Sequence, residues 1–250
     1  MKKLLGLKSM LLLGILACAP ALQAGPQINV GVVYDYLDGD KGTYLKRVFN
    51  GGDSTAFVRI SIMEIFYDEQ GNISEQPLKD RGDSSKDGLI ASPARLIVPA
   101  NGMQSTRLLF LGDRSRERYF RVRFVPVMPE KEDEFAVSEQ ERAEYKEKLT
   151  AGVNVLAGYG TVFFVRPNDT KFNSVIDNSA QQYRIRNNGN TVVVVDEFKD
   201  CAINSETDCA PTLKHHIMAG HAFEFNKQPG RHYLFTLVEG AKQTKMDIRG

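Results

Sequence analysis

The chain has 250 residues, of which 42% are hydrophobic and 25% charged, and its formal net charge is +1 at pH 7. The first 24 residues contain three lysines and no acidic residue, so the remaining chain has a formal charge of −2. This balance argues against a nucleic-acid partner, and the length that remains suits two domains of ordinary size.

The N-terminal segment 1–24 has the three-part pattern of a secretory signal. Lysines come first, the apolar run 10–17 follows, and small residues stand at Ala21 and Ala24. The apolar run is too short for a stable membrane span, so we expect cleavage after Ala24. Lipid attachment at Cys18, within "ILAC", is the alternative. No later apolar run approaches about 20 residues, so we expect a soluble exported protein without stable membrane insertion.

Most of the chain after Gly25 alternates apolar and polar residues with the period of two that is typical of β-strands. Pro93 and Pro99 interrupt the segment 89–102, which suits an edge strand or a strand that changes direction. The clearest strand-length segments of the first half are 43–50, 55–68, 104–112 and 118–129. Those of the second half are 182–187, 191–200, 221–227, 231–240 and 244–250.

The segment 130–149 breaks this pattern, with eight acidic and four basic residues and almost no apolar face. Such a block is typical of a solvated, mobile segment, with a short helix as the alternative. The many short strands predict an all-β fold of two antiparallel β-sandwiches. We place their boundary near Pro167, which gives a first domain at 25–167 and a second at 168–250.

The segment 150–167 is predicted to form one long β-strand. In its first half, small apolar residues alternate with polar residues and glycines, so one face is apolar but poorly suited to filling a core. These residues are Val153, Val155 and Ala157, with Tyr159 next on the same face. In its second half, residues 162–165 are continuously apolar, which predicts burial on both faces.

Cys201 and Cys209 are the two cysteines left after removal of the signal, and a polar turn lies between them. In an oxidising compartment this pair is expected to form a disulfide that links neighbouring strands or a strand and a loop. A metal site would need further ligands, and His215 and His216 do not have the spacing of a zinc motif. We therefore expect no bound metal.

Motifs of the common catalytic sites are absent from the sequence. There is no G-x-S-x-G, no H-E-x-x-H and no free cysteine after the signal. All four histidines lie between residues 215 and 232. His215 and His216 are predicted to lie on a loop as structural residues, and as a strand pair they would face opposite sides. We expect neither an enzyme nor a cofactor.

Arg47 is a candidate binding residue. In "TYLKRVFN", Leu45, Arg47 and Phe49 share one face, and if that face points inward the guanidinium needs an anion. The anion could be an internal carboxylate such as Glu64 or Glu117, or the arginine could reach out to solvent. Alternatively, Arg47 waits for a carboxylate that belongs to a partner.

The segment "SPARLIVPANGMQSTRLLFLGDRSRERYFRVRFVPVMP", followed by "VNVLAGYGTVFFVRP", resembles the first domain of periplasmic pilus chaperones. The absence of a basic residue in the first strand, together with "YLKRVF" and "CAINSETDC", is similar to the alternate (α) chaperone–usher branch. The resemblance implies two immunoglobulin-like sandwiches in a boomerang arrangement. It also implies that the protein binds pilin subunits in the periplasm and delivers them to an outer-membrane usher.

Such chaperones lend a strand to a pilin that lacks one. By resemblance, the subunit-binding residues are Arg47, Val153, Val155, Ala157 and Tyr159. Glu117 and Arg166 match a structural ion pair. The better-known branch has a lysine where this chain has Val162, so the identity of a second carboxylate anchor is open, with Thr161 and Lys148 as weak substitutes. The alternative reading is a secreted β-sandwich adhesin or lectin-like module.

Overall fold

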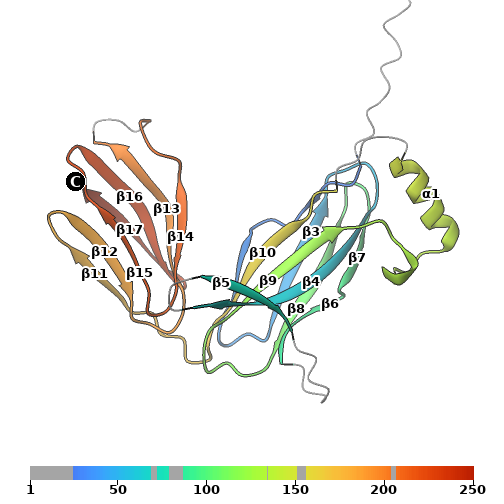
Figure 1. Ribbon diagram of the computed structural model, residues 1–250, viewed down its shortest axis with the longest axis horizontal. Helices are drawn as coiled ribbons and strands as arrows, with labels where there is room; N and C mark the ends of the chain where they lie inside the picture. The colour runs from blue at the N-terminus through green and yellow to red at the C-terminus, as the bar shows by residue number, and fades with distance from the viewer. Residues whose placement is uncertain (1–24, 69–71, 79–86, 134, 151–155, 204–206) are drawn as a thin grey trace, which may run out of the picture.

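The computed structural model describes residues 25–68, 72–78, 87–133, 135–150, 156–203 and 207–250. Almost all of its regular structure is β, and the strands form two sandwiches that meet at an angle like the arms of a boomerang (Figure 1). Strands β1–β10 make the first sandwich and β11–β17 the second. The all-β prediction is confirmed, although one pair of strands in the first sandwich is parallel rather than antiparallel.

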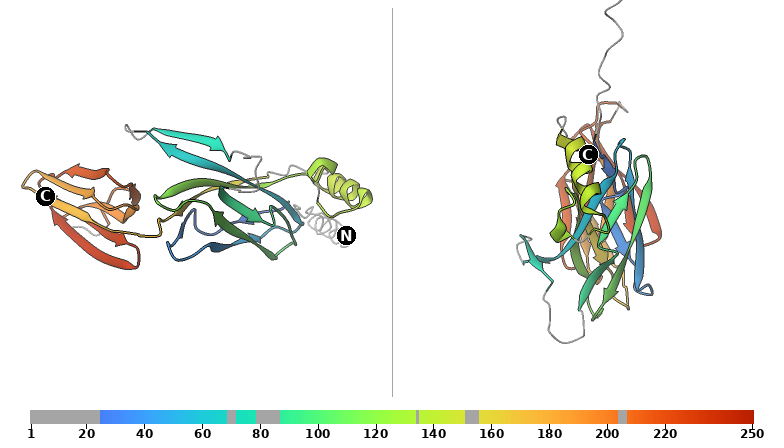
Figure 2. Two further views of the ribbon diagram at one scale, coloured as in Figure 1. Left: turned by 90° about the horizontal axis from the view of Figure 1, so that it is seen from below. Right: turned by 90° about the vertical axis from the view of Figure 1, so that its right-hand side faces the viewer.

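Two sheets make the first sandwich. One contains, in order, β1 (Ile28–Asn29), β3 (Thr43–Asn50), β8 (Met103–Leu111) and β6 (Gly88–Ser92). The other contains β2 (Tyr34–Leu37), β10 (Tyr159–Val165), β9 (Arg118–Pro126), β4 (Ala56–Tyr67) and β5 (Ile73–Pro77), with β7 (Arg95–Val98) also paired to β4. The ribbon of β4 and β5 extends beyond the body of the sandwich (Figure 2).

The chain crosses between these two sheets repeatedly in short segments, and two of the crossings contain residues of special backbone conformation. Gly31 has a φ of +71°, a conformation that glycine adopts without strain, and it lies between β1 in one sheet and β2 in the other. Pro93 lies between β6 and β7, which also belong to different sheets. The predicted change of strand direction at Pro93 is therefore confirmed.

The core between the sheets contains fully buried aromatic residues, among them Phe120, Phe124 and Phe163. On β10, Phe163, Phe164 and Val165 are buried and Val162 is partly buried, so the predicted burial on both faces is confirmed for three of the four residues 162–165. The predicted strand is longer than the observed one, because β10 begins at Tyr159 and residues 156–158 have no strand structure.

A short 3₁₀ turn, η1 (Lys131–Asp133), and helix α1 (Glu139–Thr150) lie between β9 and β10. The helix begins with a capping box, in which the Ser138 N–H donates to Glu141 Oε2 at 2.7 Å and the Glu141 N–H to Ser138 Oγ at 3.2 Å. No helix among the described residues is long and apolar enough to cross a membrane.

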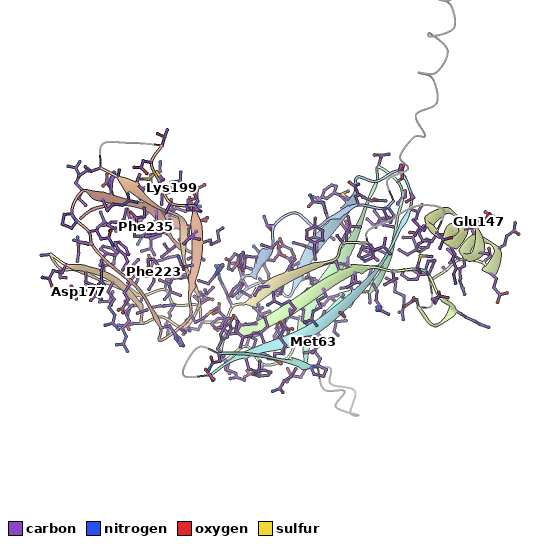
Figure 3. All side chains as sticks on the ribbon, turned by 45° about the horizontal axis from the view of Figure 1, so that its top comes forward. Met63, Glu147, Asp177, Lys199, Phe223 and Phe235 are labelled. Carbon is purple, nitrogen blue, oxygen red and sulfur yellow. A yellow bond between two sulfur atoms is a disulfide. The ribbon has the colours of Figure 1, made fainter. Side chains whose placement is uncertain are left out.

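Helix α1 is anchored by a small apolar cluster of its own, made by Phe57, Phe135, Tyr145 and Leu149. The Tyr145 hydroxyl also donates to the Thr55 carbonyl oxygen at 2.8 Å. Most of the charged side chains that the structure describes on this helix are exposed, as at Glu147 (Figure 3). The prediction of a solvated block was therefore incomplete, because two apolar residues one turn apart are enough to hold the helix against the sandwich.

The second sandwich also consists of two sheets. They contain β11 (Ser174–Asn178), β12 (Gln182–Asn187) and β15 (Ala222–Asn226), and β14 (Leu213–Ile217), β13 (Val193–Ala202), β16 (Arg231–Glu239) and β17 (Lys242–Arg249). Aromatic residues such as Tyr183, Phe223 and Phe235 fill the space between them (Figure 3). Cys201 and Cys209 form the predicted disulfide, at the end of β13.

Candidate functional site

One side of β10 is only partly covered. β2 runs parallel to β10 and pairs with it from Val162 onward, where the Val162 N–H donates to the Val33 carbonyl oxygen at 2.8 Å. Alternate residues of a strand direct their backbone N–H and C=O groups to the same side, so those of Gly160 point to the same edge as those of Val162. Among the described residues, no strand pairs with 159–161 on this side. β10 therefore has an open backbone edge where another strand can add.

The side chains along this edge divide between two faces. Tyr159 packs partly against the core of the first sandwich, and Thr161 is buried. Ala157 lies two residues before Tyr159 in the sequence and is exposed. Val153 and Val155, the other residues predicted to share this face, lie outside the described residues. A strand paired to the edge would thus meet Tyr159 on its core-facing side.

Lys46 lies buried at the end of this open edge. Its side chain points from β3 between the two sheets, and its ammonium donates to Asp35 Oδ2 at 2.6 Å and to the Val32 carbonyl oxygen at 2.7 Å. Asp35 is buried on β2, and its other carboxylate oxygen accepts a hydrogen bond from the Tyr44 hydroxyl at 2.7 Å. Burial and this bond raise the pKa of Tyr44 well above its ordinary value.

Arg47 lies on the opposite face of β3, exposed to solvent. Its neighbours on that face, Leu45 and Phe49, are 53% and 45% exposed, whereas Lys46 and Val48 are buried. The assumption that the Leu45–Arg47–Phe49 face points inward was therefore wrong. Both faces of this strand carry two apolar residues and one base, so the pattern alone had no preference, and the buried partner Asp35 comes from another strand.

Arg166 and Glu117 lie near the junction of the sandwiches, where the resemblance implied a direct ion pair between them. Arg166 instead donates to Asp38 Oδ1 at 2.8 Å. Its guanidinium carbon also lies 5.2 Å from the ring centre of Tyr36 and 5.3 Å from that of Phe172. These contacts replace the direct ion pair.

Glu117 connects the two sandwiches. It comes directly before β9 and accepts hydrogen bonds from Thr191 Oγ1 at 2.5 Å and from the Val192 N–H at 2.8 Å, both in the second sandwich. Tyr119 donates a third bond at 3.0 Å. Burial raises the pKa of Glu117 to about 7, although these donors and the Arg166 charge act in the opposite direction. The carboxyl group therefore changes charge near neutral pH.

A second contact across the junction involves His216 of β14. Its Nε2 lies 2.7 Å from the Tyr36 hydroxyl, and its ring stacks on Phe164 with centroids 5.1 Å apart. Burial lowers the pKa of His216 to about 4, so the imidazole is neutral at pH 7. His215 faces the other way and contacts Phe223, which confirms the opposite orientation of the two histidines. Their predicted position on a loop was wrong, because both belong to β14.

No family model matches the sequence. Among curated proteins, the chain is 30% identical over 141 residues to a CS1 fimbrial subunit of Escherichia coli, a match that covers 55% of this chain and 56% of that protein. It is 25% identical over 233 residues to a probable fimbrial chaperone, EcpB, of E. coli O157:H7, and this match covers 91% of the chain and 90% of the relative. The chain is a relative of the fimbrial chaperones.

The fold agrees with this relationship. A crystal structure of the class 5 fimbriae chaperone CfaA matches 90% of this chain and 100% of that one, with a TM-score of 0.53 and 19% identity. The structure is thus the two-domain, immunoglobulin-like β-sandwich fold of the pilus chaperones, as predicted.

Lys46 and Asp35 are the residues near the open edge that the sequence analysis missed. The lysine was visible in "TYLKRVFN" as the base on the Tyr44–Val48 face. An acidic residue in the alternating segment 34–37 was the available signal for its partner, since a buried carboxylate in a strand needs a cation.

Proposed function

We propose that this protein is a non-enzymatic periplasmic chaperone that binds pilin subunits by lending them a strand and delivers them to an outer-membrane usher. The observation that carries the proposal is the open edge of β10 at 159–161, because an unpaired strand edge in an otherwise closed sandwich invites strand addition. The relationship to fimbrial chaperones supports the same function.

The proposed donor strand consists of Val153, Val155, Ala157 and Tyr159, whose spacing of two matches the pockets that a missing strand leaves in a pilin. Small side chains enter such pockets without overpacking and fill them incompletely. A better-fitting strand from the next pilin can then replace the chaperone's strand.

The basic anchor for the pilin's terminal carboxylate is proposed to be Lys46 rather than Arg47. A strand added along the open edge has to stop at Val32 and Val33, directly before β2, and the Lys46 ammonium contacts the Val32 carbonyl oxygen. Arg47 points to solvent from the outer face of the other sheet. It therefore has no geometric route to that position.

The test is co-expression with the exported proteins encoded beside this chain, followed by purification of the complex from the periplasm. We expect a one-to-one complex with a small pilin. Replacement of both Val153 and Val155 with aspartate should abolish it and leave the chaperone folded, since each lost valine removes about 1–2 kcal/mol of apolar contact. Asn154→Asp, on the opposite face of the same segment, is the matched control.

Four outcomes would contradict the proposal. Equal loss of binding in the Asn154 variant, or unfolding of the double variant, would place the segment in an ordinary internal core. Recovery of this chain as a component of the assembled fibre would make it a fimbrial subunit, the role stated in the name of its CS1 relative. Absence of any pilin complex would leave the adhesin reading as the better one.

Export is proposed on the sequence pattern of residues 1–24. N-terminal sequencing of the periplasmic protein should begin at Gly25 if cleavage follows Ala24. A mature protein that retains residues 1–24, or a lipid on Cys18, would contradict this part of the proposal.

A further inference from the structure

The Lys46 ammonium has only one N–H group left for another partner. It has three donors, and the carbonyl oxygen of Val32 and the carboxylate of Asp35 accept two of them. The two charged side chains are 4% and 0% exposed. The free protein therefore already neutralises, with its own carboxylate, the cation that lies at the end of its open edge.

The direction of β2 indicates what kind of group would reach this cation. β2 is parallel to β10 and pairs with it from Val162 onward. A strand that pairs with residues 159–161 in the same direction as β2 would therefore have its C-terminal end beside Val32 and Val33. A chain that terminates there presents a carboxylate to Lys46. An antiparallel strand would present an amino group, which the ammonium repels.

Two carboxylates at one buried ammonium leave an uncompensated negative charge, which is costly where water is excluded. The cost is removed if one of the carboxylates takes up a proton, and the protonated acid can then donate a hydrogen bond to the other. Among the described residues, the titratable groups bonded to Asp35 are Lys46 and Tyr44, both on β3. From β10, Asp35 faces the apolar Phe163.

We propose that Asp35 is an internal stand-in for the pilin's terminal carboxylate: it holds Lys46 in the free chaperone and takes up one proton from solvent when the pilin's carboxylate arrives. This inference rests on the proposed function. Asp35 competes with the pilin for the anchor, so it weakens capture while keeping the buried lysine neutralised between pilins. Binding is consequently stronger at lower pH.

A purely structural ion pair makes different predictions. Asp35→Asn preserves the shape of the side chain and removes the competing charge. If the pair only stabilises the fold, this substitution lowers the stability of the chaperone and leaves pilin binding unchanged or weaker. If Asp35 competes with the pilin, the chaperone becomes less stable and yet binds the pilin more tightly.

The experiment measures binding of a synthetic peptide with the C-terminal strand sequence of the co-purified pilin, once with a free carboxylate and once amidated. Calorimetry in phosphate and in Tris, which differ in ionisation enthalpy, counts the protons taken up. The wild type should take up about one proton with the free acid, with an affinity that rises about tenfold for each pH unit lowered between about pH 8 and pH 6. The amidated peptide should bind more weakly, without proton uptake.

Asp35→Asn should take up no proton and bind the free-acid peptide at least about 30-fold more tightly than the wild type at pH 7.5, because the wild type gains that factor between pH 7.5 and pH 6. Arg47→Gln, beside the anchor in sequence but on the opposite face, should behave as the wild type. No proton uptake by the wild type, or unchanged or weaker binding by a folded Asp35→Asn, would overturn the inference. If Asp35→Asn does not fold, the proton count of the wild type with the two peptides decides alone. A wild type that forms no complex with any pilin would instead contradict the proposed function.

Discussion

Replacement of Lys46 with methionine tests the assignment of the inward face of β3. The substitution keeps an unbranched side chain of similar length but leaves the Asp35 carboxylate, with a fully buried side chain, without its cation. Loss of one member of a buried ion pair costs about 3–5 kcal/mol, because the remaining charge stays desolvated.

The matched control is Arg47→Met, one residue further along the same strand. Its side chain is exposed, so we expect the free energy of unfolding to change by less than about 0.5 kcal/mol. A double variant, Lys46→Met with Asp35→Leu, should recover most of the loss, because both buried charges are then gone.

The chain has no tryptophan and two sandwiches, so a single fluorescence transition is a poor measure of its stability. Urea unfolding followed by circular dichroism, combined with hydrogen exchange of peptides from β3 and from β16, assigns the loss to one sandwich. A small effect of Lys46→Met and a large effect of Arg47→Met would refute the inward position of Lys46.

Three further substitutions test the junction, the helix and the disulfide. The pKa of Glu117 is raised to about 7 in the folded protein, so the contribution of this group to stability is fully present below about pH 4.5 and is lost as the pH rises through about 7. The decline in the free energy of unfolding amounts to about 3 kcal/mol at most. Glu117→Gln should flatten this decline in melting curves measured from pH 4 to pH 8. Tyr145→Ala should release helix α1 and speed amide exchange in 139–150 while β9 stays protected, whereas Lys146→Ala, exposed beside it, should do neither. Replacement of Cys201 and Cys209 with serine should lower the stability of the second sandwich by about 2.5 kcal/mol without unfolding it, and free thiols found by mass spectrometry in the exported wild type would contradict the disulfide.

Local patterns in the sequence determined much of the fold. Alternation with a period of two is a property of single strands, so it was sufficient to predict the strands around Phe120 and Phe235. Neighbouring residues were likewise sufficient to predict the change of direction at Pro93 and the burial of Phe163 and Phe164. The pairing of Cys201 with Cys209 was predictable because only two cysteines follow the signal.

The site depended on tertiary structure. "TYLKRVFN" has equivalent faces, and the partner of the inward-pointing Lys46 is the carboxylate of Asp35, which lies on β2 of the other sheet, beyond the crossing at Gly31. Glu117 bonds to Thr191 rather than to Arg166 because the second sandwich supplies donors that lie 74 residues away in the chain. A buried charge needs a partner, but the pattern of one strand cannot say which distant strand provides it, because that choice is made by the packing of the whole molecule.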